Sequence, residues 1–220
     1  MKWKRYSEQL SSWPKSGRYI MAQFDEDTVV VYQAYRESIG RFAVEKQFFG
    51  GDFSYSRMSW IKTSFLWMMY RSGWAGKMDQ EIVLAVRIKR EGFEEILGSA
   101  VHSTFVPEVY GTSDWKLAGQ AADVRLQWDP DHGPSGAKQE RRAIQLGLRG
   151  DALRRYGSDW IVAIEDISEL ARERCRLEKA GDLENLTTPE EDIYPVSDAR
   201  VAARLGVASG ESVLNCFACP

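Results

Sequence analysis

Six consecutive apolar residues, Phe-Leu-Trp-Met-Met-Tyr at 65–70, impose the strongest constraint on how this chain folds. Thr63 and Ser64 precede the run, and either side chain can accept a hydrogen bond from the first turn of a helix. Gly73 follows it, where helices commonly end in a left-handed residue. We therefore expect a helix over about 63–72. A helix that is apolar on nearly every side must be buried, so the rest of the chain has to fold around it.

Segments typical of strands and of helices lie on both sides of this helix. The expected strands are 28–35, 81–89, 123–128, 143–148 and 159–167, and the expected helices are 36–49, 92–100, 151–156, 169–179 and 199–205. Residues 129–136 are rich in Asp, Pro and Gly, which indicates a surface loop. Strands also follow one another without long helices between them. We therefore expect an α+β fold, with a mixed or antiparallel sheet packed around the central helix.

The length of 220 residues fits one domain. We expect a single compact domain over 1–206 and a variable carboxyl-terminal tail over 207–220.

Charge and composition exclude several classes of protein. The formal net charge is −3 and the sequence pI is about 5.6, so the chain lacks the basic surface of a protein that coats nucleic acid non-specifically. No apolar run approaches the ~20 residues of a membrane helix, and the first residues lack the apolar core of a signal peptide. These features favour a cytoplasmic protein with no membrane partner.

The three cysteines are Cys175, Cys216 and Cys219. Their odd number does not suggest a disulfide framework, which agrees with a reducing cytoplasm. Cys216 and Cys219 have C-x-x-C spacing, but a structural zinc site needs four ligands and there is no second pair. We expect no metal site.

Three long segments carry a family resemblance. They are 29–45, 57–74 with its continuation 77–88, and 124–168. Together they resemble the DUF4291 family from about residue 20 to 206. The Trp- and Met-rich middle segment is the most specific part. The resemblance implies membership of a family of unknown function and supplies no catalytic residues.

Cations surround the central helix. Arg57, Lys62 and Arg71 flank a group of hydroxyl side chains that includes Ser59. Guanidinium, ammonium and hydroxyl donors at a helix start suit a phosphate group. A helix that is only core, with hydrated charges at its ends, explains the same pattern.

A second basic segment, 147–156, has a glycine-bearing turn that leads into a short helix. Backbone N–H groups in such a turn can bind phosphate, and Arg149, Arg154 and Arg155 add positive charge. The simpler interpretation is a helix cap with a solvated basic face.

Glu81 opens an expected strand after Gln80. This arrangement is similar to the acidic strand motif of ADP-ribosyltransferases, in which a glutamate orients the nicotinamide ribose. On that analogy, the strand around Tyr32 and Arg36 supplies the first motif and 54–59 the second. A solvated or salt-bridged glutamate is the alternative.

His132 lies in the expected 129–136 loop between acidic residues. The functional interpretation is a general acid or base, or a metal ligand, with carboxylate support. The alternative is a polar surface turn. We expect His102 to be structural.

Two hypotheses from different classes follow. The first is an enzyme acting on a phosphate-bearing nucleotide or NAD, with ADP-ribosyl transfer as its sharpest form. Its catalytic candidates are Glu81, Lys62 and His132, and its ligand-binding candidates are Tyr32, Arg36, Arg57, Ser59, Trp60, Arg71 and Arg149. The second is a non-catalytic module that binds nucleic acid or a protein through aromatic residues and the arginines of 147–156.

Overall fold

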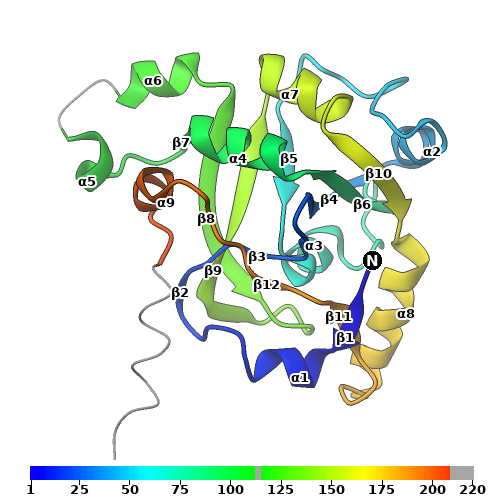
Figure 1. Cartoon of the computed structure of the whole chain (residues 1–220). Helices are drawn as coiled ribbons and strands as arrows, with labels where there is room; N and C mark the ends of the chain where they lie inside the picture. The colour runs from blue at the N-terminus through cyan, green and yellow to red at the C-terminus, as the bar shows by residue number, and fades with distance from the viewer. Residues whose placement is uncertain (112–114, 209–220) are drawn as a thin grey trace, which may run out of the picture.

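A mixed sheet of eight strands forms the centre of the computed structural model, which describes residues 1–111 and 115–208 (Figure 1). The strands are β1 (Trp3–Arg5), β2 (Gly17–Arg18), β3 (Met21–Ala22), β4 (Thr28–Tyr35), β5 (Ser59–Lys62), β6 (Ile82–Lys89), β7 (Ala100–His102), β8 (Val124–His132), β9 (Lys138–Leu148), β10 (Ile161–Asp166), β11 (Thr187–Pro189) and β12 (Asp192–Ile193). The helices are α1 (Tyr6–Leu10), α2 (Glu37–Lys46), α3 (Phe65–Ser72), α4 (Arg90–Ser99), α5 (Pro107–Tyr110), α6 (Trp115–Ala121), α7 (Gly150–Gly157), α8 (Ser168–Lys179) and α9 (Ala199–Leu205). The described residues have the expected α+β fold.

The sheet has the strand order β10-β6-β4-β5-β9-β8-β7, and β2 pairs with β9. Neighbouring strands are antiparallel except for the β7–β8 and β2–β9 pairs, which are parallel. The pairs β1–β11 and β3–β12 lie outside this sheet.

The two faces of the sheet bury different sets of side chains, because successive residues of a strand point to opposite sides. On β4, Val29 and Val31 join one apolar cluster, together with residues of α4 and α7. Val30 and Tyr32 join the other cluster, together with α3. The sheet is therefore covered on both faces, which explains why β4 and β6 are apolar almost throughout.

Helix α3 confirms the buried helix expected at the centre. Ser64 is its N-cap and accepts a hydrogen bond from Trp67 N, while Gly73 ends it with φ +58°. The helix contacts β4, β5, β8 and β11. The first five residues of the helix, 65–69, are buried, whereas Tyr70 is 45 % exposed. The helix is therefore not enclosed on every side.

A buried polar network joins α3 to segments far from it in sequence. The carboxyl group of Glu191 accepts a hydrogen bond from Phe65 N at 2.7 Å, and Gln9 Oε1 accepts one from Glu191 N at 2.9 Å. Asp131 accepts a hydrogen bond from Ser64 Oγ at 3.0 Å and forms a 2.6 Å ion pair with Arg141. The network satisfies the amino end of α3 inside the protein, where water is excluded.

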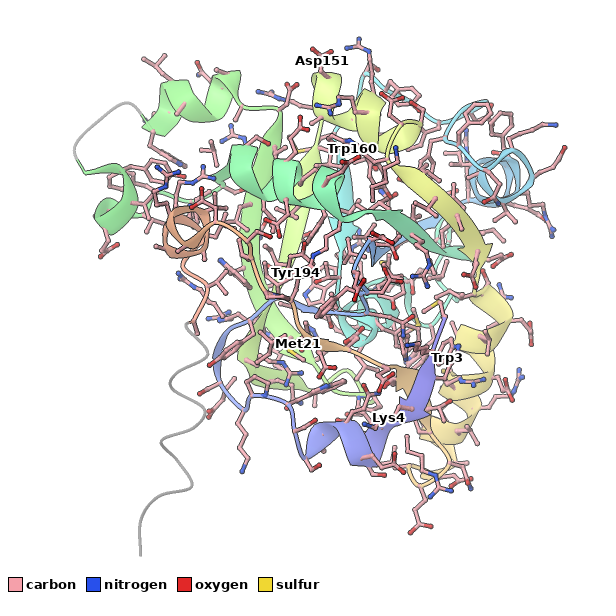
Figure 2. All side chains as sticks on the ribbon, viewed as in Figure 1. Trp3, Lys4, Met21, Asp151, Trp160 and Tyr194 are labelled. Carbon is pink, nitrogen blue, oxygen red and sulfur yellow. The ribbon has the colours of Figure 1, made fainter. Side chains whose placement is uncertain are left out.

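The carboxyl-terminal segment also returns to the middle of the molecule. Tyr194 N donates to Ile20 O at 2.8 Å, and Figure 2 shows Tyr194 at the centre of the view near Met21. Tyr194 is buried against Phe93 of α4.

The sequence prediction is wrong at residues 129–136. Strand β8 extends to His132, and only 133–137 form the turn to β9. A bulge between Pro130 and His132 lets a proline stand in the strand. The expected tail begins at 207, and residues 209–220, including Cys216 and Cys219, lie outside the described residues.

Burial raises the pKa of Glu191 to about 8, with Asp131 contributing in the same direction. The folded protein therefore holds a proton that the unfolded chain releases above its ordinary pKa near 4.5. Stability should fall between pH 4.5 and 8, by about 1.4 kcal/mol per pH unit from this group. Glu191→Gln keeps an acceptor oxygen for Phe65 N, so it should remove this slope and be more stable than wild type at pH 8.

Urea denaturation at pH 5, 6.5 and 8 measures this effect. The control is Glu184→Gln, which changes an exposed glutamate. Equal slopes for wild type and Glu191→Gln would contradict a neutral, buried Glu191 carboxyl group.

Candidate functional site

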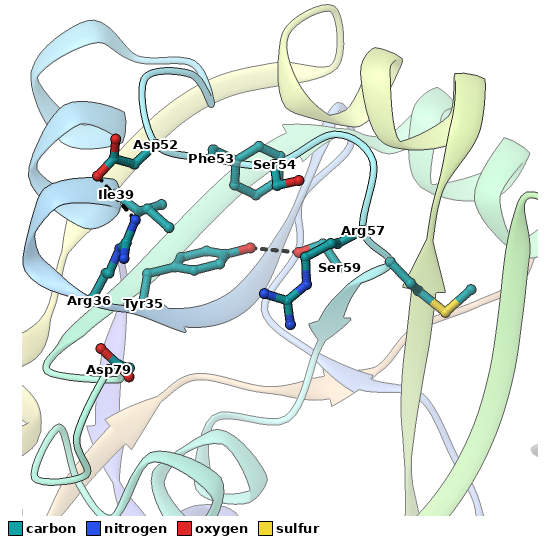
Figure 3. Close-up of a pocket in the computed structure, with 10 residues that line it drawn as sticks. Tyr35, Arg36, Ile39, Asp52, Phe53, Ser54, Arg57, Ser59 and Asp79 are labelled. Carbon is teal, nitrogen blue, oxygen red and sulfur yellow. Dashed lines mark hydrogen bonds and ion pairs between the residues drawn. The ribbon is translucent and has the colours of Figure 1, made fainter.

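A pocket of about 440 Å³ opens where β4 ends and β5 begins. Its walls come from the end of β4, the start of α2, the segment 52–59 and Asp79 (Figure 3). Its lining residues are Tyr35, Arg36, Ile39, Asp52, Phe53, Ser54, Arg57, Met58, Ser59 and Asp79. We call it the first pocket. Its volume lies within the range of roughly 300–1,000 Å³ that is usual for small-molecule sites.

The pocket exists because β4 and β5 pair at one position only, Tyr32 opposite Lys62. Beyond that pair, the side chain of Gln33 takes the place of backbone pairing: its Nε2 lies 3.2 Å from Trp60 O, 2.8 Å from Ser59 Oγ and 2.7 Å from Tyr35 Oη. Gln33 is buried. One amide thus fills the gap between the two strands.

The same network fixes the hydroxyl groups that face the pocket. Tyr156 donates to Gln33 Oε1 at 2.7 Å, which sets the orientation of the amide and directs its N–H groups toward Tyr35 and Ser59. The Tyr35 and Ser59 hydroxyls lie 2.6 Å apart, and one donates to the other. The hydroxyl that accepts in this pair keeps its own hydrogen, which it can donate to a ligand.

The two guanidinium groups of the first pocket differ in their partners. Figure 3 shows Arg36 and Arg57 on opposite sides of Tyr35. Arg36 forms a 3.1 Å ion pair with Asp52. Arg57 is exposed and has no ion pair or hydrogen bond within residues 1–111 and 115–208. Arg57 is therefore the cation of this pocket that is available to an anionic ligand.

A second pocket, of about 590 Å³, adjoins the first and shares Arg36 and Asp79 with it. Its lining residues are Arg36, Glu37, Arg41, Asp79, Glu81, Ile82, Asp166, Ser168, Glu169 and Arg172. Glu81 thus stands beside Arg36, because Tyr35 pairs with Ile82 across β4 and β6. The Glu81 carboxyl group accepts a hydrogen bond from Asp79 N at 2.9 Å. Asp79 itself has φ +60°.

The structure places Lys62 away from both pockets, on the face of β5 that α3 covers. Its side chain is 6 % exposed, and its Nζ lies 3.5 Å from Trp60 O and 4.9 Å from the ring centre of Trp67. Burial lowers the pKa of Lys62 to about 7, and the charge of Arg71 acts in the same direction. Lys62 is a partly neutral amine near pH 7, but it does not lie with Arg57 and Arg36.

His132 is a buried strand residue rather than a loop residue. It is 3 % exposed, its ring stacks on Tyr70 at 3.7 Å, and neither ring nitrogen has a hydrogen-bond partner. Burial lowers the pKa of His132, which favours the neutral ring. Burial also raises the pKa of neighbouring Asp129. The Asp129 carboxyl group accepts hydrogen bonds from Gln127 and Gln145. His132 lines neither pocket, whereas Glu81, the other carboxylate or imidazole candidate for catalysis, lines the second.

The other expected ligand-binding residues divide between the first pocket and structural roles. Ser59, Arg36 and Arg57 line the first pocket, as Glu81 lines the second. Tyr32 is fully buried against Phe65, so it cannot stack on a ligand.

Trp60, Arg71 and Arg149 lie outside the two pockets. Trp60 is half-buried and its ring packs on Gly147. A Cβ atom added to Gly147 would stand 3.0 Å from that ring. Arg71 donates to Gln80 at 3.2 Å. Arg149 donates to the backbone carbonyls of Ala122, Gly119 and Gln120 and so holds the end of α6.

The neighbouring arginines of α7 also have partners. Arg154 pairs with Asp151 at 2.8 Å, and Arg155 pairs with Glu95 and stacks on Trp160. These arginines bind side chains of the protein itself.

Sequence reasoning missed Tyr35, Phe53 and Gln33. The period-two pattern of β4 held a usable signal for two of them, since Gln33 and Tyr35 fall on one face and Tyr32 on the other. The pattern does not say which face carries a pocket. Phe53 comes from the loop before β5, and no periodicity applies there.

The described residues contain no group of three or more His, Cys, Asp or Glu side chains arranged to hold a metal ion. Within the same part of the chain, no helix combines the length and hydropathy needed to cross a membrane.

Comparison with known proteins gives one family match. The model described as "Domain of unknown function (DUF4291)" matches residues 19–194. The match covers most of the chain and ends before α9, whereas the resemblance was expected to continue to about residue 206. A search of the curated proteins found no match.

The lowered pKa of Lys62 predicts a specific pH dependence of stability. Between pH 7 and 10.5 the unfolded chain holds a proton on this amine that the folded protein does not, so stability should rise with pH in that window. Below pH 7 the folded protein buries an ammonium group. Lys62→Met should therefore stabilise the protein at pH 6 and lose this part of the pH dependence.

Chemical denaturation at pH 6, 7.5 and 9 measures the difference between the two proteins. Lys15→Met, at an exposed lysine, is the matched control. A destabilised Lys62→Met protein at pH 6 would show that the ammonium group has a stabilising partner.

Proposed function

The chain belongs to the DUF4291 family, and we propose that it is an enzyme that binds a phosphate-bearing, nucleotide-type ligand in the first pocket. The observation that carries this proposal is the unpaired guanidinium group of Arg57 beside an aromatic and hydroxyl-lined cavity. Phosphate is the common biological anion that an arginine and hydroxyl donors bind together. The aromatic rings of Tyr35 and Phe53 offer apolar contact to a flat ring or a sugar.

The position of Glu81 supports a group-transfer reaction. Arg36 follows β4, Ser59 begins β5 and Glu81 precedes β6. These three strands are neighbours, so the three residues lie at the same end of the sheet. These residues belong to the three segments that the analogy with ADP-ribosyltransferases assigns to its three motifs. Glu81 and Arg36 line one cavity, and Ser59 and Arg36 line the other.

The most specific reaction that we propose is ADP-ribosyl transfer from NAD. The bond between ribose C1′ and the nicotinamide nitrogen breaks, and nicotinamide leaves with the electron pair. A nucleophile of the acceptor forms a bond to C1′ and loses its proton to solvent or a base. The carboxylate of Glu81 would stabilise the positive charge that develops on the ribose.

The alternative, a nucleic-acid or protein-binding module, has less support. It needs free cations on 147–156, and the three arginines there already have partners within the protein. The cytoplasm remains the proposed location.

A thermal-shift screen against NAD, ATP, GTP, other nucleotides and short oligonucleotides tests the proposal. A ligand at about a hundred times its Kd stabilises the fold by about 2.7 kcal/mol. Stabilisation by a nucleotide supports the enzyme, and release of nicotinamide from NAD would establish its sharpest form. Stabilisation by oligonucleotides alone would favour the binding module.

Arg57→Ala should weaken nucleotide binding by about tenfold or more, since a hydrogen bond to a charged group contributes roughly 1.5–3 kcal/mol. The melting temperature of the free protein should not change, because Arg57 is exposed and has no partner among the described residues. Isothermal titration calorimetry measures the Kd. Arg154→Ala removes an arginine of the basic segment and is the matched control; equal Kd values for both variants would refute the role of Arg57.

A further inference from the structure

A group of polar side chains lies on the face of the sheet that α3 covers, and none of them lines either pocket. We call this group the polar ring, because contacts and strand pairing join its members in a closed sequence. The members come from β5, β9, β8 and α3. They are Lys62, Gln145, Asp129, His132, Tyr70 and Trp67.

Three strands supply one side of the polar ring. Lys62 of β5 pairs with Gln145 of β9, so the two side chains lie next to each other on one face of the sheet. Gln145 Nε2 donates to Asp129 Oδ2 at 2.5 Å, and Gln127 Nε2 donates to Asp129 Oδ1 at 3.1 Å. Both oxygens of this carboxyl group therefore already have donors.

Helix α3 supplies the other side of the polar ring. Trp67, Tyr70 and Arg71 are spaced by three and four residues, so they lie on one side of the helix. The Nζ atom of Lys62 is 4.9 Å from the ring centre of Trp67, and the Tyr70 ring stacks on His132 at 3.7 Å. Because Tyr70 is 45 % exposed and Arg71 is exposed, the polar ring reaches solvent on this side.

The polar ring contains buried polar atoms that the described residues leave unsatisfied. Trp67 Nε1 and both ring nitrogens of His132 have no hydrogen-bond partner there, although each residue is more than nine-tenths buried. Lys62 is 6 % exposed, and its Nζ has one long contact, 3.5 Å to Trp60 O. Buried donors without acceptors destabilise a fold. Their grouping at one place indicates a bound group that supplies acceptor oxygens.

The charges near the polar ring favour an anion. Arg71 donates to the neutral amide oxygen of Gln80 and forms no ion pair within the part of the chain that the structure describes. Its charge also contributes to the lowered pKa of Lys62, after burial, so the two cations are close. The one carboxyl group of the polar ring, that of Asp129, has a pKa that burial raises, which weakens its negative charge near neutral pH. An oxyanion can accept hydrogen bonds from both cations.

We infer that the polar ring binds a small oxyanion group, the chemistry that phosphates and carboxylates share, between Lys62 Nζ, Trp67 Nε1 and Arg71. In one of its two neutral tautomers, His132 can turn an N–H group toward the same anion. The site is separate from the first pocket, so the inference does not depend on the proposed function. A bound anion favours the charged form of the Lys62 amine. Binding should therefore be coupled to the uptake of one proton.

Four titratable or charged side chains surround the Lys62 amine. They are Arg71 from α3, Asp129 and His132 from β8, and Tyr32, which pairs with Lys62, from β4. Burial lowers the pKa of His132 and raises the pKa of Tyr32, so both are neutral at pH 8. Lys62, with a pKa lowered to about 7, is the amine that gains charge when an anion binds at this pH.

Isothermal titration calorimetry with sulfate tests the inference, because sulfate itself does not titrate near neutral pH. The titrations use the full chain carrying Arg57→Ala, in which the first pocket has lost its free cation. They are run at pH 8 in Tris and in triethanolamine, two cationic buffers with different ionisation enthalpies. The difference in observed enthalpy should correspond to about 0.9 proton taken up per sulfate, because a pKa of about 7 leaves that share of Lys62 neutral at pH 8.

A second series with acetate distinguishes the two sources of the oxyanion. Tighter binding of sulfate assigns the site to a phosphate-like group, and tighter binding of acetate assigns it to a carboxylate.

Two substitutions locate the anion in the polar ring. Lys62→Met removes the amine, so it should weaken sulfate binding about tenfold or more and abolish the dependence on buffer. Trp67→Phe keeps an aromatic ring near the amine and removes the Nε1 donor. It should weaken binding several-fold and keep the proton uptake. Lys15→Met, at an exposed lysine, is the matched control and should change neither quantity.

Three outcomes would overturn the inference. The first is equal sulfate binding by Lys62→Met and Lys15→Met. The second is binding without proton uptake, or uptake that disappears in Asp129→Asn, which would assign the proton to that carboxyl group. The third is no binding of either anion, in which case water alone satisfies the polar ring. Because every titration lacks the guanidinium group of Arg57, each of these results leaves the proposed function of the first pocket standing.

Discussion

The buried amide of Gln33 is the interaction on which the arrangement of the site depends. Strands β4 and β5 pair at Tyr32 and Lys62 and nowhere else. Gln33 then supplies the hydrogen bonds that the missing ladder would have made, and Tyr156 satisfies its carbonyl oxygen. A buried polar group without partners costs about 1–3 kcal/mol, so the gap between the strands persists only because this amide is fully bonded. The gap places Tyr35, Ser59 and the loop before β5 around one cavity.

Helix α3 imposes the second constraint, on the opposite face of the sheet. It covers the face that carries Tyr32 and Lys62, and its burial requires partners for its amino end. The side chains that provide them, Glu191 and Asp131, come from distant segments. Both faces of the sheet are thus closed by packing, and the pockets lie at the end of the sheet where β4 and β5 diverge.

The sequence predicted well those features whose causes are local. The bounds of β4 were predicted correctly, because its run of β-branched and aromatic residues is continuous. Ser64 and Gly73 bounded α3 as expected, since caps act within one turn. The short strands β1, β3, β11 and β12 were missed, because two or three residues carry no periodic signal and their partners lie more than 150 residues away.

The candidate site was predicted in part for the same reason. Four of the expected residues lie together at one end of the sheet, where strand ends meet: Arg36, Arg57, Ser59 and Glu81. Lys62 and His132 do not join them: Lys62 points to the face under α3, and His132 continues a strand past a bulge. Composition around 129–136 indicated a loop, but pairing of His132 with Lys138 across the hairpin decided the outcome.

The hydrogen bond between Phe65 N and Glu191 also bears on how the protein forms during synthesis. Residues 65 and 191 are 126 positions apart, and Gln9 and Glu191 are 182 apart. A ribosome adds about 5–20 residues per second, so α3 leaves it many seconds before its partner carboxyl group is made. During that interval Phe65 N lacks its acceptor, the Glu191 carboxyl group, and Gln9 Oε1 lacks its donor, Glu191 N. The nascent chain therefore cannot complete its centre until residue 191 has emerged from the ribosome.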